Sequence, residues 1–235
     1  MKNAALVLAG GVGSRMNMGS FPKQYLTVDD RPVLDYCLCT FQKTDDVDAI
    51  VIVADSSWHD FINGWLEKSK ITKFMGFADP GETRQMSIFN GLLVVEEQVA
   101  DCENVIIHDA ARPLISQNLI TACFRELQDA DGVMPVLPVK DTCYQSLDGK
   151  TISGFLPRSQ LFAGQAPEAF RLKPYLALHR TLPKAVLLEI SGSSELAYKH
   201  GLKVSMIPGE ERNFKITTQD DLKLLEKYLH SEETR

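Results

Sequence analysis

The feature that most constrains the fold is a set of short runs that are apolar at every position. Residues 4–9, 49–54 and 105–107 have this character, with no polar residue between the apolar ones. A strand with one face in water alternates polar and apolar residues, whereas a parallel strand covered by helices on both faces is apolar throughout. These runs therefore predict buried parallel strands.

Segments with helical periodicity lie between these strands and after them. The alternation of strands and helices predicts an α/β fold with a doubly wound, mostly parallel, Rossmann-like sheet and right-handed crossovers. No internal repeat or long linker occurs, so we expect a single domain over residues 1–235. Helices are expected at 33–41, 56–68, 83–98, 116–127, from 173, 193–200 and 218–229, and a strand at 203–207. The expected N-caps are Ser56 or Ser57, Thr83, Ser116, and Thr217 or Thr218.

Residues 141–164 differ in texture from the rest of the chain. Two turn signals, Asp148-Gly149 and Ser153-Gly154, interrupt the segment, and it has little helical periodicity. We interpret it as a small extended arm that leaves the main sheet, and as a candidate contact between two copies of the chain.

Charge and cysteine content exclude several classes of protein. The net charge of −6 argues against a general nucleic-acid coat or a polybasic membrane binder. No apolar run is long enough to span a membrane, and residues 1–8 lack the features of a signal peptide. The five cysteines have no metal-type spacing. We therefore expect reduced thiols and a cytoplasmic protein, with no nucleic-acid or membrane partner.

A glycine-rich loop follows the first predicted strand directly. Residues 8–16 read LAGGVGSRM, so three glycines within four residues let backbone N–H groups approach a phosphate. The spacing is neither the Walker form nor the dinucleotide fingerprint, and no acidic residue ends a second strand about 20 residues on, which disfavours a dehydrogenase. Arg15 and Lys23 add two cations, which suits a triphosphate. The alternative is a plain tight turn with two exposed basic residues.

Further motifs narrow the interpretation. They are PKQ at 22–24, GETR at 81–84 with Ser87, HDAARP at 108–113, PVKDT at 138–142 and NFKIT at 213–217. With the glycine loop they resemble the nucleotidyltransferases that make CDP-methylerythritol in isoprenoid synthesis, and their relatives that make CDP-ribitol for cell-wall and other surface polymers. The resemblance runs from about residue 4 to about residue 229. It implies a nucleotidyltransferase sheet and a CTP-dependent cytidylyltransferase that releases pyrophosphate.

The resemblance also implies roles on the nucleotide side. Arg15 and Lys23 are the implied catalytic cations, which offset the charge that develops at the α-phosphate. The cytosine is expected against Gly81, Arg84 and Ser87. Without the resemblance, Thr83 and Ser87 are simply a helix cap and a first-turn residue. The residues implied in wrapping the triphosphate are Ala9, Gly10, Gly11 and Gly13.

The metal and acceptor residues come from the same resemblance. Asp109, at a predicted strand end, is the implied Mg²⁺ ligand, and its alternative is a loop-capping role. Lys215 is a third catalytic cation on the acceptor side, and His108 is taken as structural. Arg112 either binds the acceptor or braces its own loop. The implied acceptor-binding residues are Arg112, Thr142, Arg158 and Ser191, with the arm forming a homodimer that completes the site.

Two stretches depart from the pattern of the isoprenoid enzymes. Their Thr-Pro-Gln is Ala166-Pro167-Glu168 here, and their Ile-Thr-Asp-Glu-Ala is Ile-Ser-Gly-Ser-Ser at 190–194. Residues 156–158 and 164–165 are closer to the CDP-ribitol enzymes, so ribitol 5-phosphate or a similar polyol phosphate is expected ahead of methylerythritol phosphate. One rival is a UTP or GTP enzyme that uses a hexose 1-phosphate, although its long sugar-binding insert is missing. The other is a non-catalytic relative that binds nucleotide.

Overall fold

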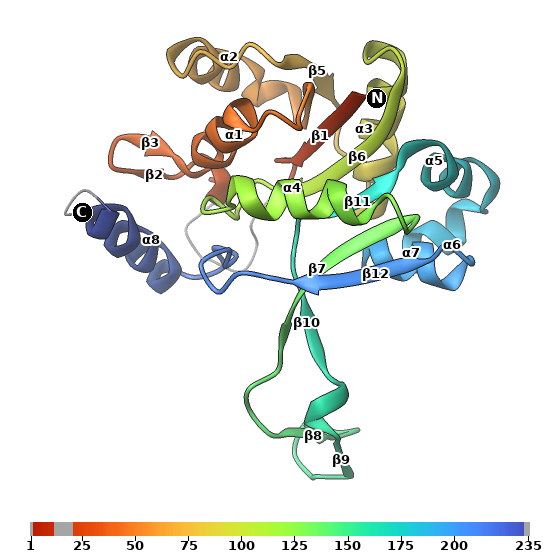
Figure 1. Cartoon of the computed structure of the whole chain (residues 1–235). Coiled ribbons are helices and arrows are strands. Elements are labelled where there is room, and N and C mark those ends of the chain that lie inside the picture. The colour runs from red at the N-terminus through yellow and green to blue at the C-terminus, as the bar shows by residue number, and fades with distance from the viewer. Residues whose placement is uncertain (1, 12–20, 233–235) are drawn as a thin grey trace.

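The chain folds around one mixed sheet with helices on both faces (Figure 1). The computed structural model describes residues 2–11 and 21–232. The strand order is β10-β7-β11-β6-β1-β4-β5, and β12 pairs with β7 at the side of this path. The strands are β1 (Lys2–Leu8), β4 (Ala49–Val53), β5 (Phe74–Ala78), β6 (Cys102–Asp109), β7 (Gly132–Pro138), β10 (Phe162–Gly164), β11 (Glu168–Arg171) and β12 (Val204–Pro208).

Pairing in this sheet is mostly parallel. β1 lies between β4 and β6 and is parallel to both, β4 is parallel to β5, and β12 is parallel to β7. β11 runs antiparallel between β6 and β7, and β10 is antiparallel to β7. The predicted α/β class and Rossmann-like sheet are confirmed. The all-apolar runs are central strands, whereas β5, β7 and β11 were not predicted.

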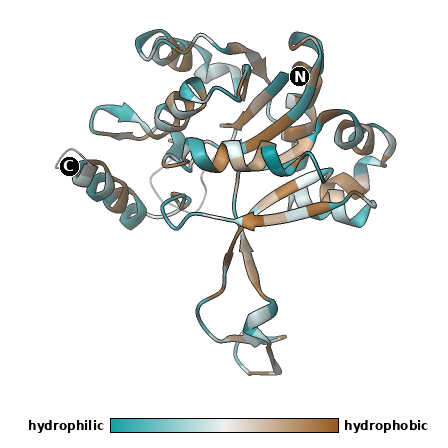
Figure 2. Cartoon of the chain, viewed as in Figure 1, coloured by the Kyte–Doolittle hydropathy of each residue, from teal (hydrophilic) through white to brown (hydrophobic). Residues whose placement is uncertain are grey.

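The two layers of helices explain why the central strands are apolar throughout. Ala5 and Val7 of β1 pack into the core on one face, and Ala4 and Leu6 pack into the core on the other. Because successive side chains of a strand point to opposite faces, a sheet covered twice needs apolar residues at every position. Figure 2 shows this as apolar central strands between helices with mixed surfaces. The first core includes α1 (Val33–Lys43), α2 (His59–Lys68) and α4 (Gln117–Glu126), and the second α3 (Arg84–Gln98), α5 (Leu172–Thr181), α6 (Lys184–Glu189) and α7 (Ser193–Lys199).

Three of the four predicted N-caps hold, at Thr83, Ser116 and Thr218, and one is wrong. The Thr83 hydroxyl accepts a hydrogen bond from the N–H of Met86, and the Ser116 hydroxyl caps α4 in the same way. Before α2, however, neither Ser56 nor Ser57 is the cap. The Asp55 carboxylate accepts from the N–H of Ser57 at 3.0 Å and starts a 3-10 turn that precedes the helix. A carboxylate near a helix start also interacts favourably with the helix dipole.

The last helix, α8 (Gln219–Glu232), lies against a short hairpin of β2 (Thr27–Val28) and β3 (Arg31–Pro32). Val28, Ile216 and Leu225 belong to the small core between them. Its first turn is capped reciprocally. The N–H of Asp221 donates to the Thr218 hydroxyl, and the N–H of Thr218 donates to the Asp221 carboxylate. Within residues 2–11 and 21–232, the structure has no helix with the length and apolar character that a membrane crossing requires.

An extended arm leaves the sheet between β7 and β10, as the sequence predicts (Figure 1). Its tip is a hairpin of β8 (Cys143–Gln145) and β9 (Gly154–Leu156), followed by a 3-10 turn. Large apolar side chains on this arm are exposed, with Leu147 at 90% and Phe155 at 75% of their full accessible surface. The arm therefore carries apolar surface that its own chain does not cover.

Candidate functional site

A cavity of about 800 Å³ opens at the carboxyl ends of β1, β4 and β6. Its walls come from residues 8–11, from residues 22–25, from the loop before α3, and from Lys215 and Thr217 near the C-terminus. In open α/β sheets, the crevice at the carboxyl ends of the strands is where ligands bind. This is the edge at which the sequence predicts the nucleotide.

The described part of the glycine loop is held from outside by residues 22–25. The Gln24 side-chain amide donates to the carbonyl oxygens of Ala9 and Gly11, and the Tyr25 hydroxyl donates to that of Ala9 at 3.0 Å. The N–H of Ala9 donates to the carbonyl of Val53, so this N–H is not available to a phosphate. Ala9 therefore shapes the loop, and Gly10 and Gly11 are its other described members at the cavity wall.

Two glycines allow the walls of the cavity to approach each other closely. A Cβ at Gly10 would lie 2.6 Å from Cβ of Pro80. A Cβ at Gly81 would lie 2.5 Å from Cβ of Met86 and 2.9 Å from the backbone nitrogen of Ser87. Both contacts are far inside van der Waals distance, so side chains at these positions would force the loops apart.

The predicted cations of the loop are only partly described. Lys23 begins the 3-10 turn Lys23–Tyr25, is half-buried and lines the cavity. Gly13 and Arg15 lie outside the described residues.

The start of α3 forms the wall opposite the glycine loop. The N–H of Gly81 donates to the Ser87 hydroxyl at 2.9 Å, and that hydroxyl donates to the carbonyl of Thr83. The alternative reading of Thr83 as a cap and Ser87 as a first-turn residue is therefore correct as a description of their contacts. Gly81, Arg84 and Ser87 all line the cavity, where the sequence predicts the cytosine.

An aromatic wall at the cavity was not predicted. The Trp58 ring stacks on Tyr25 with centroids 4.1 Å apart, and Phe21 and Phe61 meet it edge-on. Trp58 and Tyr25 both line the cavity. Their contact joins segments more than 30 residues apart, so no local sequence pattern predicts it.

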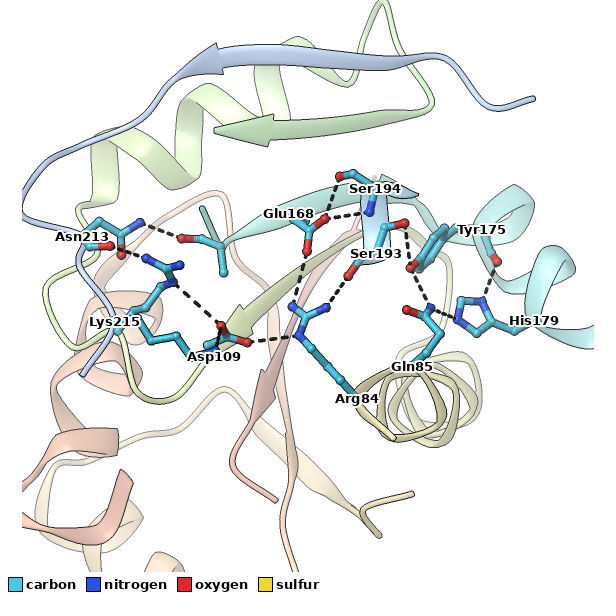
Figure 3. A network of polar contacts seen from close by, with 12 residues as sticks. Arg84, Gln85, Asp109, Glu168, Tyr175, His179, Ser193, Ser194, Asn213 and Lys215 are labelled. Atoms are coloured by element: carbon cyan, nitrogen blue, oxygen red, sulfur yellow. Dashed lines mark hydrogen bonds and ion pairs between the residues drawn. The ribbon is translucent and has the colours of Figure 1, made fainter. Parts of the chain in front are cut away.

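Asp109, the last residue of β6, lies in a cluster of cations (Figure 3). Its carboxylate is 2.7 Å from the Lys215 amine and 3.4 Å from the Arg84 guanidinium. Arg112 is the third cation, at 3.8 Å. Burial alone raises the pKa of a carboxyl group, but Arg84 and Lys215 outweigh it and hold the pKa of Asp109 well below its usual range. Asp109 is thus ionised at any pH at which the protein works.

Arg112 connects its loop to the segment that precedes Lys215. Its guanidinium donates to the carbonyl of Asn213 at 2.7 Å, and it is not among the residues that line the cavity. His108 is fully buried, with Nε2 hydrogen-bonded to the carbonyl of Arg112. Burial lowers the pKa of His108 to about 4, so the ring is neutral near pH 7. This position fits the structural role predicted for it.

Three predicted acceptor residues lie away from the cavity. Thr142 and Arg158 are exposed on the arm, where Arg158 donates to the carbonyl of Lys140. Ser191 is exposed before α7, and both its N–H and its hydroxyl donate to the Glu195 carboxylate. The fold of one chain therefore brings the described members of the predicted nucleotide set to the cavity, but not these three.

Nearly the whole chain is similar to known cytidylyltransferases. A family profile described as 2-C-methyl-D-erythritol 4-phosphate cytidylyltransferase (IspD) matches residues 3–231. A ribitol-5-phosphate cytidylyltransferase from Streptococcus agalactiae is 34% identical over 94% of this chain and 92% of its own length. A 2-C-methyl-D-erythritol 4-phosphate cytidylyltransferase from Rubrobacter xylanophilus is 38% identical over 98% and 96%.

Solved structures agree on the fold. The 4-diphosphocytidyl-2C-methyl-D-erythritol synthase of Anaerococcus prevotii has a TM-score of 0.82 and 27% identity, covering 97% of this chain and 96% of that one. The 2-C-methyl-D-erythritol 4-phosphate cytidylyltransferase of Thermus thermophilus has a TM-score of 0.75 and 27% identity, covering 97% and 98%.

Proposed function

The chain belongs to the 2-C-methyl-D-erythritol 4-phosphate cytidylyltransferase family, and from this membership we propose that it transfers CMP from CTP to ribitol 5-phosphate or a similar open-chain polyol phosphate. It is a CTP-dependent cytidylyltransferase, which is a class of nucleotidyltransferase. The observation that carries the proposal is the cavity that brings together Gly10, Gly11, Lys23 and the Lys215–Asp109 pair.

The proposed reaction needs alignment and charge stabilisation. A phosphate oxygen of the acceptor attacks the α-phosphorus of CTP, the bond to the bridging oxygen breaks, and pyrophosphate leaves. Lys23 and Lys215, together with Arg15, offset the negative charge that develops on the phosphoryl oxygens. The glycine loop and the start of α3 hold the nucleotide, so no covalent intermediate with the protein is required.

Magnesium is proposed to enter with the triphosphate. Among residues 2–11 and 21–232, no group of three or more His, Cys, Asp or Glu side chains could hold a metal alone. Asp109 offers one carboxylate at the cavity, and Mg²⁺ is commonly shared between one carboxylate and substrate phosphates. The ion neutralises phosphate charge when it is bound. Because Lys215 already contacts Asp109, contact with the ion requires the Lys215 amine to turn toward the phosphates.

We also propose that two copies pair through the arm. The exposed apolar residues Tyr144, Leu147, Ile152 and Phe155 need a cover, and a second copy offers the same surface in a two-fold arrangement. In such a dimer, Thr142 and Arg158 of one chain reach the acceptor in the other. The proposed compartment is the cytoplasm, which five free thiols favour.

Two polyol phosphates are candidates for the acceptor. Ribitol 5-phosphate is supported by residues 156–158 and 164–165 and by the Streptococcus relative. Methylerythritol 4-phosphate is the second candidate, because the Rubrobacter relative is 38% identical.

An acceptor panel tests both. Pyrophosphate release is measured with CTP and with ribitol 5-phosphate or methylerythritol 4-phosphate, and UTP and GTP serve as controls. We expect release with CTP alone and the highest kcat/KM with ribitol 5-phosphate. A higher value with methylerythritol 4-phosphate would reverse the choice of acceptor. Tight CTP binding with no product on any polyol phosphate would instead favour the non-catalytic relative.

A further inference from the structure

A buried carboxylate on β11 has no role in the account above. Glu168 is 7% exposed, and its Oε2 accepts from the N–H of Ser194 at 2.8 Å and from the Ser194 hydroxyl at 2.7 Å. Its Oε1 lies 3.4 Å from Nη2 of Arg84. Figure 3 shows Glu168 between the start of α7 and the guanidinium of Arg84.

Arg84 connects three elements through its three nitrogens. Its Nε lies 3.4 Å from Oδ1 of Asp109 at the end of β6. Its Nη1 donates to the Ser193 hydroxyl on α7 at 2.7 Å, and its Nη2 faces Glu168. The planar fork of a guanidinium has fixed directions, so these partners determine how Arg84 is oriented.

A second set of contacts joins the same two helices. The Gln85 amide on α3 donates to the Tyr175 hydroxyl at 3.1 Å, and that hydroxyl donates to the carbonyl of Ser193. Consecutive residues of α3 therefore both connect to Ser193. The start of the helix that lines the nucleotide cavity is tied to the segment that precedes and begins α7.

The charges explain why a carboxylate is needed at position 168. Arg84, Arg112 and Lys215 all face Asp109, and one carboxylate cannot balance three buried or half-buried cations. Glu168 supplies the second negative charge from the far side of Arg84. This allows Asp109 to keep its short contact with Lys215 rather than share it with a strongly attracted Arg84.

We propose that Glu168 is a positioning residue that holds Arg84 away from Lys215 and fixes the start of α7 against α3, so that it sets both turnover and the affinity for the acceptor. The inference rests on the proposed function. The two departures from the family pattern then form one change. Glu168, in the first altered stretch, accepts from the N–H and the hydroxyl of Ser194, in the second.

The test compares Glu168→Gln with the wild type by steady-state kinetics in both substrates. Glu168→Gln keeps the shape and removes the charge, so we expect kcat/KM for the acceptor to fall about 10- to 100-fold, the range for hydrogen bonds to charged groups. The KM for CTP should rise less than the KM for the acceptor, because Glu168 contacts only Arg84 among the residues expected against the cytosine and touches neither Gly81 nor Ser87. Glu96→Gln is the control, since it removes another carboxylate paired with an arginine, at the surface of α3.

Two further variants separate charge from folding. Glu168→Asp keeps the charge and should retain more kcat/KM than Glu168→Gln. Ser194→Ala keeps the charge but removes one contact, and should raise the acceptor KM by about three- to tenfold. If Glu168→Gln does not fold, these two variants decide the matter. Restoration of turnover when Ser193→Asp is added to Glu168→Gln would support the charge argument further.

The outcomes distinguish this inference from the proposed function. An inactive wild type overturns the proposed function and this inference with it. An active wild type, with variants that melt earlier but keep both KM values and kcat per folded molecule, overturns the positioning role alone. Equal increases in KM for CTP and the acceptor would also overturn it, because they indicate a general loss of structure.

Discussion

The nucleotide side and the acceptor side of the molecule are built in different ways. The glycine loop, Lys23, Gly81 and Asp109 come from four separate segments, yet one chain brings them around a single cavity. Thr142 and Arg158, by contrast, are exposed on an arm that leaves the sheet. A nucleotide site that a single chain completes can keep its chemistry while the acceptor region changes. The stretches at 166–168 and 190–194, which contain the altered residues, are the ones that the resemblance assigns to the acceptor side.

The largest effect is expected on the nucleotide side. Lys23→Ala should lower kcat by about 100- to 1000-fold, because a cation that stabilises developing phosphate charge is lost. Unfolding free energy should change by less than about 0.5 kcal/mol, since Lys23 is half-buried in a loop. Lys227→Ala, at an exposed position of α8, is the control and should change neither quantity. Parallel losses of activity and stability would argue that Lys23 maintains the fold.

The acceptor side makes a prediction about two chains. Arg158→Ala should lower turnover strongly while leaving the melting temperature near that of the wild type, because its side chain is exposed. If the arm of one chain serves the site of its partner, mixing this variant with Lys23→Ala restores activity. Half of the random dimers are mixed and each contains one intact site, so about a quarter of wild-type turnover is expected. Turnover is measured after the chains have been allowed to exchange.

The mixing experiment can also contradict the proposal that the arm of one chain serves the site of the other. A mixture that stays as inactive as its components would place Arg158 in the site of its own chain. The arm would then have to fold back toward the cavity in the working enzyme. Single-variant samples incubated in the same way are the control for spontaneous recovery.

His108 and His179 are buried histidines whose titration should affect stability. Burial lowers the pKa of His108 and of His179 to about 4, below the value of about 6.5 for an unfolded chain. A depressed pKa contributes stability that is complete above pH 6.5 and is lost as the pH falls toward 4. Unfolding free energy should therefore fall through this window, by up to roughly 3 kcal/mol for each histidine.

Replacing one histidine shows how much of the loss of stability it causes. His179 donates from Nδ1 to the carbonyl of Tyr175 and accepts from the Gln85 amide, so His179→Gln keeps a polar side chain there. Denaturant unfolding between pH 7 and pH 4.5 should show a shallower fall for this variant. An unchanged pH dependence would show that His179 does not contribute to the loss of unfolding free energy at low pH.

The sequence predicts the layers of the fold better than its contacts between distant segments. β1, β4 and β6 are recognisable because burial on both faces makes a central run of each strand apolar at every position. β7 contains Pro135 and Pro138, which argue against a central strand, and β11 has four residues with charges at both ends. Neither strand therefore has a local signal.

The candidate site also contains both local motifs, which the sequence predicts, and contacts between distant segments, which it does not. The glycine loop and the cations near it are local motifs, so they could be found from the sequence. Glu168 could only be noted as a departure, because its partner Arg84 is 84 residues away in the chain. The pairing of Trp58 with Tyr25 was missed for the same reason. Ion pairs and aromatic contacts between distant segments depend on the topology of the fold, which a single sequence does not reveal.

The smallest effect is expected at Ser191, which lies before α7, outside both the cavity and the arm. Its hydroxyl donates to Glu195 at 2.7 Å, but the residue is exposed, so the oxygen can still accept from an acceptor group in a dimer. Ser191→Ala should cost about 0.5 to 1 kcal/mol of stability, because it removes the hydrogen bond from the hydroxyl to the Glu195 carboxylate. If the proposed acceptor role is right, it should also raise the acceptor KM by about three- to tenfold while leaving the KM for CTP unchanged. Ser231→Ala, which removes another exposed hydroxyl bonded within its own helix, is the matched control. A stability change with no change in the acceptor KM would restrict Ser191 to its contact with Glu195 and would leave the acceptor side to the arm.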